Sequence, residues 1–280
     1  MAPVGLAGRL RVLAILHPFP SALNAILVAG LFRLAGGDPV RGIQLGLGML
    51  GIQFAIGALN DVADAEADAV TKRSKPIAAG LLSRSTALRV GVVCAAFGLA
   101  VYATFGGLAL VLGAGMLGIG LAYDFGLKRR GLGWLCWAAA FPLLPLSTWL
   151  AATGALPPRP EILLPVAALA GPALQLANGL VDLERDRDNG IPAPVVRLGR
   201  QNSIRLLACL VGLVYGLAWL SLAGRPAVAA AYAAAAVGSA FAVIGVLLSS
   251  TEAPARRERG WQAQAVGIVL LAAGWVAAVV

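Results

Sequence analysis

Nine long apolar stretches, separated by short polar segments, most constrain what this chain can fold into. Each approaches the roughly 20 residues that an α-helix needs to cross the hydrocarbon core of a bilayer. Only α-helices and closed β-barrels satisfy their backbone hydrogen bonds in lipid, and the alternating pattern of a barrel strand is absent. We therefore predict an all-α polytopic membrane protein, with nine transmembrane helices around a central cavity in a single domain, 1–280. The predicted spans are 14–34, 41–59, 86–104, 108–124, 132–152, 161–181, 202–223, 226–249 and 260–280.

The basic residues predict the orientation of these spans. Most of the 22 Lys and Arg residues flank loops on one side of the predicted bundle. The four on the opposite side are Arg33, Arg41, Arg159 and Arg225. By the positive-inside rule, the Lys/Arg-rich side is cytoplasmic, and so is the N-terminus with Arg9 and Arg11. The net charge of +9 then reflects membrane topology and anionic lipids rather than nucleic acid. We expect a protein of the cell inner membrane whose active site faces the cytoplasm.

Two acidic segments form an internal repeat in this otherwise apolar chain. "NDVADAEAD" at 60–68 and "NGLVDLERD" at 178–186 align, and each follows a predicted helix that ends on the cytoplasmic side. Within each segment, one Asn and two Asp recur every four residues, which places them on one face of a helix. These residues are Asn60, Asp64 and Asp68 in the first segment and Asn178, Asp182 and Asp186 in the second.

This spacing predicts a metal site. Like charges one helical turn apart repel each other, and a divalent cation lying across them relieves the repulsion. Carboxylates without His or Cys suit Mg²⁺, which proteins hold through one or two carboxylates plus substrate phosphates. Basic residues downstream would neutralise the rest of the anion: Lys72, Arg73 and Lys75 after the first segment, Arg187 and Arg197 after the second. The pattern indicates a lipid diphosphate, with its head at the membrane surface and its tail among apolar helices.

Simpler interpretations account for less of the sequence. A single acidic cluster would be a solvated loop, but two clusters in matching register favour a site. Paired acids also occur in the repeats of transporters, although here they lie at helix ends and the number of spans is odd. The single His17 and the three cysteines show no catalytic or metal-ligand spacing, so His17 is expected to be a helix-end or packing residue.

The two segments resemble the Asp-rich motifs of the UbiA-type family of intramembrane prenyltransferases. Residues 60–68 match the first motif, Asn-Asp-x-x-Asp-x-x-x-Asp, at every defined position, and "TKRSKPIAAGLLS" resembles its basic tail. "DLERD" and the downstream "PVVRLG" resemble the second motif. Two features depart from the family pattern. Gly179 leaves the second motif one carboxylate short, a gap that Asp188 could fill, and Tyr123 and Lys128 have an unusual spacing.

The resemblance implies Mg²⁺-dependent transfer of a prenyl group from an isoprenoid diphosphate. The implied metal ligands are Asp61, Asp64, Asp68, Asp182 and Asp186. The implied diphosphate-binding residues are Asn60, Lys72, Arg73, Lys75, Asn178 and Arg197. Tyr123 and Lys128 are expected to assist departure of the diphosphate. Glu66, Glu184 or the diphosphate itself could take the proton that the acceptor loses.

These residues do not fix the acceptor. We expect an aromatic acid or quinone precursor such as 4-hydroxybenzoate, and a role in lipoquinone synthesis. Haem, chlorophyllides and glycerol-phosphate lipids are handled by similar scaffolds. Phosphoribosyl transfer to a lipid phosphate, ether-lipid prenyl transfer and terpene cyclisation are the alternatives, and a non-enzymatic transporter is the least favoured.

Overall fold

The computed structural model describes residues 12–226 and 228–279, and all regular elements in these ranges are helical. Arg9 and Arg11, which entered the topology prediction, lie outside the described residues. The elements are η1 (Leu13–Leu16), α2 (Pro18–Leu34), α3 (Pro39–Thr71), α4 (Arg84–Ala103), α5 (Gly107–Ala122), η2 (Tyr123–Leu127), α6 (Gly133–Thr153), α7 (Pro160–Val181), α8 (Leu183–Asp188), α9 (Pro194–Leu198), α10 (Arg200–Leu222), α11 (Ala229–Ser249) and α12 (Pro254–Val279).

The predicted spans all coincide with apolar helices of the described part. Within residues 12–226 and 228–279, eight helices are long and apolar enough to cross a membrane, with α5 continuing through η2. The remaining one, α2, is shorter at 17 residues. The all-α membrane class is thus confirmed, and the span number is close to the predicted nine. The orientation of the bundle in the membrane stays a prediction.

The helix that carries the first motif ends later than predicted, whereas α7 ends at Val181, where the predicted span 161–181 also ends. Asp38 caps α3 by accepting a hydrogen bond from the Arg41 amide at 3.0 Å, and α3 then runs unbroken through the whole first motif to Thr71. The charged residues thus prolong the helix beyond its apolar part instead of forming a loop. In the second motif the helix is interrupted, because α7 ends at Val181 and α8 begins after a kink at Asp182.

Close helix packing builds the bundle. Extensive contacts pair α11 with α12, α3 with α4, and α6 with α7. Small residues let membrane helices approach closely, and Gly171 of α7 lies so near α6 that a Cβ there would overlap the carbonyl oxygen of Trp137. The outward faces of α4, α10 and α11 expose apolar side chains such as Val93, Leu220 and Leu247, as a lipid-facing surface requires.

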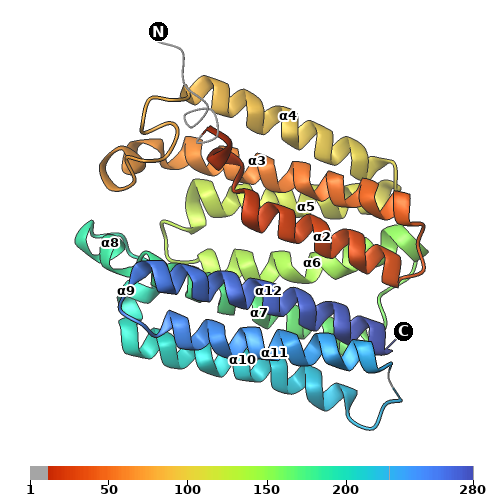
Figure 1. The fold of residues 1–280 in the computed structure, drawn as a ribbon. Helices are drawn as coiled ribbons and strands as arrows, with labels where there is room; N and C mark the ends of the chain where they lie inside the picture. Colours follow the sequence, from red (N-terminus) through yellow and green to blue (C-terminus); the bar gives the residue numbers. More distant parts are fainter. Residues whose placement is uncertain (1–11, 227, 280) are drawn as a thin grey trace.

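Both motifs lie at the same end of the bundle (Figure 1). The end of α3, the short helices α8 and α9, and the turn from α11 to α12 gather there, and the C-terminus lies at the opposite end. The Lys/Arg-rich loops that follow the motifs are therefore at this end as well. The fold thus brings together the charge of the chain and keeps the rest of the bundle apolar.

Candidate active site

A cavity of about 990 Å³ lies between the helices of the bundle. Its volume is at the upper end of the roughly 300–1,000 Å³ of small-molecule sites. The apolar part of its wall includes Ile56, Met116, Trp137, Phe141 and Trp275. The polar part of its wall comes mainly from the two motifs and the segments next to them. The cavity therefore has a charged region next to an apolar region.

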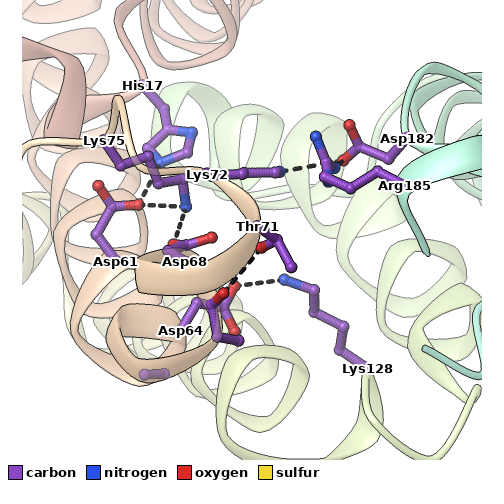
Figure 2. A network of polar contacts seen from close by, with 12 residues as sticks. His17, Asp61, Asp64, Asp68, Thr71, Lys72, Lys75, Lys128, Asp182 and Arg185 are labelled. Carbon is purple, nitrogen blue, oxygen red and sulfur yellow. Dashed lines mark hydrogen bonds and ion pairs between the residues drawn. The ribbon is translucent and has the colours of Figure 1, made fainter. Parts of the chain in front are cut away.

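The Asn and Asp residues with four-residue spacing in both motifs line this cavity. They are Asn60, Asp64, Asp68, Asn178, Asp182 and Asp186. In the first motif, the periodicity of α3 places them on one face. In the second motif, α7 supplies Asn178, α8 supplies Asp186, and Asp182 lies at the kink between the two helices. Figure 2 shows how Lys72, at the end of α3, reaches across to the second motif, its Nζ 3.1 Å from Asp182 Oδ2.

Basic side chains neutralise the motif carboxylates. Lys128 Nζ donates to Asp64 Oδ2 at 2.6 Å (Figure 2). Burial disfavours the Lys128 ammonium, but Tyr123 and Asp64 outweigh burial and raise the pKa of this lysine. Arg185 pairs with Asp182 in the second motif. Burial would raise the pKa of Asp182, yet Lys72 and Arg185 hold it below its ordinary value, so this carboxylate is charged at neutral pH.

Asp61 belongs to a separate part of this network. Lys75 Nζ lies 2.8 Å from Asp61 Oδ1 and 2.7 Å from Asp68 Oδ2, and His17 Nε2 lies 3.3 Å from Asp61 Oδ1. Burial disfavours the Lys75 ammonium, but the two carboxylates prevail and raise the pKa of Lys75. The Asp61 side chain is only 2% exposed and does not line the cavity. Asp61 therefore contacts Lys75 and His17 rather than the cavity.

Some of the expected site residues lie elsewhere. Arg73 and Arg197 are exposed and do not line the cavity. Asp188 is also exposed and outside the cavity wall, so it does not occupy the place of the missing carboxylate. At Gly179, a Cβ would lie 3.0 Å from Val195 of α9, which shows that this glycine lets α9 approach α7. Of the two proposed proton acceptors among the side chains, neither Glu66 nor Glu184 lines the cavity.

The unusual spacing between Tyr123 and Lys128 has a structural explanation. Residues Tyr123–Leu127 form a turn of π-helix, in which the Lys128 amide donates to the Tyr123 carbonyl at 3.0 Å. A π-turn accommodates an extra residue within a helix and often marks a functional site. Both side chains line the cavity, and Lys128 Nζ lies 5.8 Å from the centre of the Tyr123 ring.

The same π-turn carries a cavity residue that the motif analysis missed. Asp124 lines the cavity and its side chain is 1% exposed. The signal for it in the sequence was an acidic residue at the end of an apolar span, where ionisable groups are rare and functional. Among residues 12–226 and 228–279, no three Asp, Glu, His or Cys side chains form a metal cluster by themselves. A metal at this site would therefore also need amide or substrate oxygens.

Comparison with known families identifies this arrangement. The sequence profile of the UbiA prenyltransferase family matches residues 22–263, which include both motifs, the π-turn and most of the cavity wall. The chain belongs to the UbiA prenyltransferase family. It is accordingly an integral membrane enzyme of the prenyltransferase class, as the motifs at 60–68 and 178–186 predict.

Two relatives within this UbiA family are named for different acceptors. Over 268 residues, which cover 90% of both chains, this chain is 31% identical to a protoheme IX farnesyltransferase of Symbiobacterium thermophilum. Over 151 residues, 53% of both chains, it is 29% identical to a digeranylgeranylglyceryl phosphate synthase of Korarchaeum cryptofilum.

Solved structures of UbiA homologues share the fold. A UbiA homologue from Aeropyrum pernix K1, in its apo form, superposes with a TM-score of 0.75 at 17% identity and covers 90% of this chain and 96% of its own. A UbiA homologue from Archaeoglobus fulgidus, bound to GPP and Mg²⁺, gives a TM-score of 0.74 at 16% identity and covers 96% of this chain and 100% of its own. At these identities the likeness concerns the fold of the UbiA family.

Proposed function

We propose that this UbiA-family enzyme transfers a prenyl group from an isoprenoid diphosphate to a planar aromatic acceptor, and that it requires Mg²⁺. The observation that carries this proposal is the cavity, in which carboxylates, amides and lysines meet an apolar chamber. The two motif segments, 60–68 and 178–186, form an internal repeat within a single domain. We place their end of the bundle at the cytoplasmic face of the cell inner membrane, because the Lys and Arg residues concentrate there.

The oxygen atoms at the cavity fit Mg²⁺. We assign the metal to the carboxylates of Asp64, Asp68, Asp182 and Asp186, with the amide oxygens of Asn60 and Asn178 beside them. Mg²⁺ prefers such oxygen ligands and shares its coordination sphere with substrate phosphates. When bound, Mg²⁺ supplies positive charge against the departing diphosphate. The Archaeoglobus homologue bound to GPP and Mg²⁺ supports a role for Mg²⁺ in this chain.

The lysines of this chain bind the diphosphate. Each ammonium group has three donors, so Lys72 and Lys128 can keep their carboxylate partners and still donate to phosphate oxygens. The Tyr123 hydroxyl lies in the same wall and donates a further hydrogen bond. Asp61 acts indirectly, by positioning Lys75. Arg73 and Arg197, outside the cavity, attract the anionic substrate from the membrane surface.

The apolar part of the cavity holds the prenyl chain. Departure of the diphosphate leaves an allylic cation, which water would quench, so an apolar enclosure protects it until the acceptor attacks. Trp137, Phe141 and Trp275 line this part of the cavity. Aromatic faces stabilise a nearby cation, and they also stack on flat ring systems.

The same aromatic wall supports the choice of a planar aromatic acceptor. A planar aromatic molecule fits between such side chains, and protohaem, named in the relative that aligns over 90% of the chain, is planar and aromatic. A small aromatic acid of quinone synthesis belongs to the same class. A glyceryl phosphate lipid is the second candidate, since the synthase named for that product aligns over 53% of the chain.

The test is a product analysis with purified protein, Mg²⁺ and allylic diphosphates of increasing length. Protohaem, 4-hydroxybenzoate and a geranylgeranylglyceryl phosphate would each be offered as acceptor, and products identified by mass. We expect acceptor-dependent prenylation of an aromatic compound. Prenylation of the glyceryl phosphate alone would replace the aromatic acceptor by the second candidate. A hydrocarbon formed without acceptor would indicate a cyclase, and no diphosphate release from any allylic substrate would contradict prenyl transfer.

A further inference from the structure

Asp124 stands apart from the other carboxylates at the cavity. The motif aspartates contact lysine or arginine side chains, as in the pairs Asp64–Lys128 and Asp182–Lys72. Asp124 is 1% exposed, its Oδ2 has no hydrogen-bond partner among the described residues, and it lines the cavity. Burying a carboxylate that lacks a partner is costly. This group therefore needs a cation, a proton or a donor that the described side chains do not supply to Oδ2.

The side-chain amide of Asn60 lies against the other carboxyl oxygen of Asp124, Oδ1. One end of this amide lies 2.9 Å from Asp124 Oδ1 and 3.3 Å from Asp64 Oδ2. With its nitrogen at that end, the amide donates a hydrogen bond to each carboxylate. With its oxygen at that end, the Asn60 amide oxygen lies beside one carboxylate oxygen of each residue, Asp64 Oδ2 and Asp124 Oδ1. Asp64 Oδ2 also accepts a hydrogen bond from Lys128 Nζ.

The spacing of these atoms suits a small divalent cation. Mg²⁺ binds oxygen at about 2.0–2.1 Å in octahedral geometry, which places neighbouring ligand oxygens about 3 Å apart. The separations from the Asn60 amide, 2.9 and 3.3 Å, are close to that value. The set also combines two carboxyl groups with one neutral amide oxygen, which leaves coordination positions for the substrate phosphates.

We propose that Asp124 is a further ligand of the Mg²⁺ ion that the first motif binds, together with Asn60 and Asp64; this inference rests on the proposed function. The π-turn is the element that makes it possible, because it turns Asp124 towards α3 while Tyr123 and Lys128 keep their places in the cavity wall. The ion is then tied to two helical segments that are 60 residues apart in the sequence, since Asp64 and Asp124 belong to α3 and η2.

A purely structural role makes a different prediction. If Asp124 only accepts a hydrogen bond from the Asn60 nitrogen, it acts from outside the coordination shell, and Asp124→Asn should weaken metal binding by at most about a hundredfold. If Asp124 is a ligand, the same substitution removes one of the negative charges that hold the ion.

The experiment is a titration of the purified full-length protein with Mn²⁺ alone, in which the electron paramagnetic resonance signal reports free Mn²⁺. Partners outside the first coordination shell contribute about 10–100-fold to metal affinity, so a ligand should contribute more, and we expect Asp124→Asn to weaken Mn²⁺ binding by more than about a hundredfold. Glu66→Gln is the matched control, since Glu66 lies in the first motif but is 93% exposed at its side chain and outside the cavity wall. This control should bind Mn²⁺ like the wild type.

Two outcomes would overturn the inference in distinguishable ways. Mn²⁺ binding by Asp124→Asn that is unchanged, or weaker by no more than about a hundredfold, would refute the ligand role of Asp124 and leave the rest of the metal site standing. A wild-type protein that binds no Mn²⁺ would refute the metal site of the proposed function and this inference with it. If Asp124→Asn does not fold, Asn60→Asp provides a second test, because a third carboxylate in the set should tighten Mn²⁺ binding. Unchanged or weaker binding by Asn60→Asp would then contradict the inference.

Discussion

The guanidinium of Arg257 donates hydrogen bonds to both carboxylate oxygens of Glu184, with Nη1 2.8 Å from Oε1. Arg257 lies near the start of α12 and is fully buried, whereas the Glu184 side chain in α8 is 48% exposed. This pair fastens the short helix α8 to α12. Because α8 also carries Asp186 of the second motif, the contact positions part of the cavity wall.

The two partners should differ in their effect on stability. Glu184→Ala leaves the buried Arg257 guanidinium without its anion, and the cost should be below the about 3–5 kcal/mol of a fully buried pair, because Glu184 is half exposed. Arg257→Met leaves a carboxylate that water can reach, so its cost should be smaller. Thermal unfolding of both variants in the same detergent checks this order. A larger loss in Arg257→Met would contradict the arrangement of the pair.

The same pair predicts a dependence on pH. The hydrogen bonds from Arg257 hold the pKa of Glu184 below its ordinary value of 4.5. A group with a lowered folded-state pKa contributes stability above its unfolded pKa and loses it as the pH falls through the folded value. The unfolding temperature of the wild type should therefore drop more steeply below pH 4.5 than that of Arg257→Met. Parallel pH profiles for the two proteins would argue against this contribution.

Substitutions of Asp61 and Asp64 should have different effects on activity and metal binding, although both residues belong to the first motif. Asp64 lines the cavity, so Asp64→Asn should lower diphosphate release by about a hundredfold or more, as loss of one preorganised electrostatic group does. Asp61 is buried against Lys75 and His17 outside the cavity wall. Asp61→Asn should therefore lower the unfolding temperature and retain Mn²⁺ binding. Diphosphate-release assays and Mn²⁺ titrations on both variants test this, and loss of Mn²⁺ binding in Asp61→Asn would make Asp61 a ligand after all.

Packing between α6 and α7 depends on Gly171. A Cβ there overlaps the Trp137 carbonyl oxygen, a backbone atom that cannot turn aside. Gly171→Ala should therefore cost about 1–3 kcal/mol, as overpacking typically does, and lower the unfolding temperature. Gly212→Ala in α10 is the control, because a Cβ at that position meets nothing within 4 Å. Equal unfolding temperatures for the two variants would contradict the close approach of α6 and α7.

The features that could be predicted from the sequence are those that depend on local periodicity. Apolar length predicted the helices, and the four-residue spacing of Asn60, Asp64 and Asp68 predicted a shared face, on which all three now line the cavity. The predicted span 41–59 ends earlier than α3 does, because a run of charged residues is typical of a loop. An α-helix tolerates charges once it has left the apolar layer, and α3 continues to Thr71.

The features of the site that the sequence did not predict depend on contacts between distant parts of the chain. Position 61 matches the motif as well as position 64 does, and the motif does not show that Asp61 packs against His17 and Lys75 instead of lining the cavity. Arg257 and Glu184 are separated by 73 residues, so their pairing could not be read from either segment. Gly179 looked like a missing carboxylate and is instead where Val195 packs.

The central claim is that the two motifs form a Mg²⁺-dependent diphosphate site, and the most direct test is diphosphate release from geranyl diphosphate by purified protein. The aromatic acceptor identified by the product analysis would be present, and the rate would be followed with Mg²⁺, with EDTA and in the Asp182→Asn variant. We predict release with Mg²⁺ and none above background in the other two cases. Release at the same rate with EDTA, or in Asp182→Asn, would contradict the account.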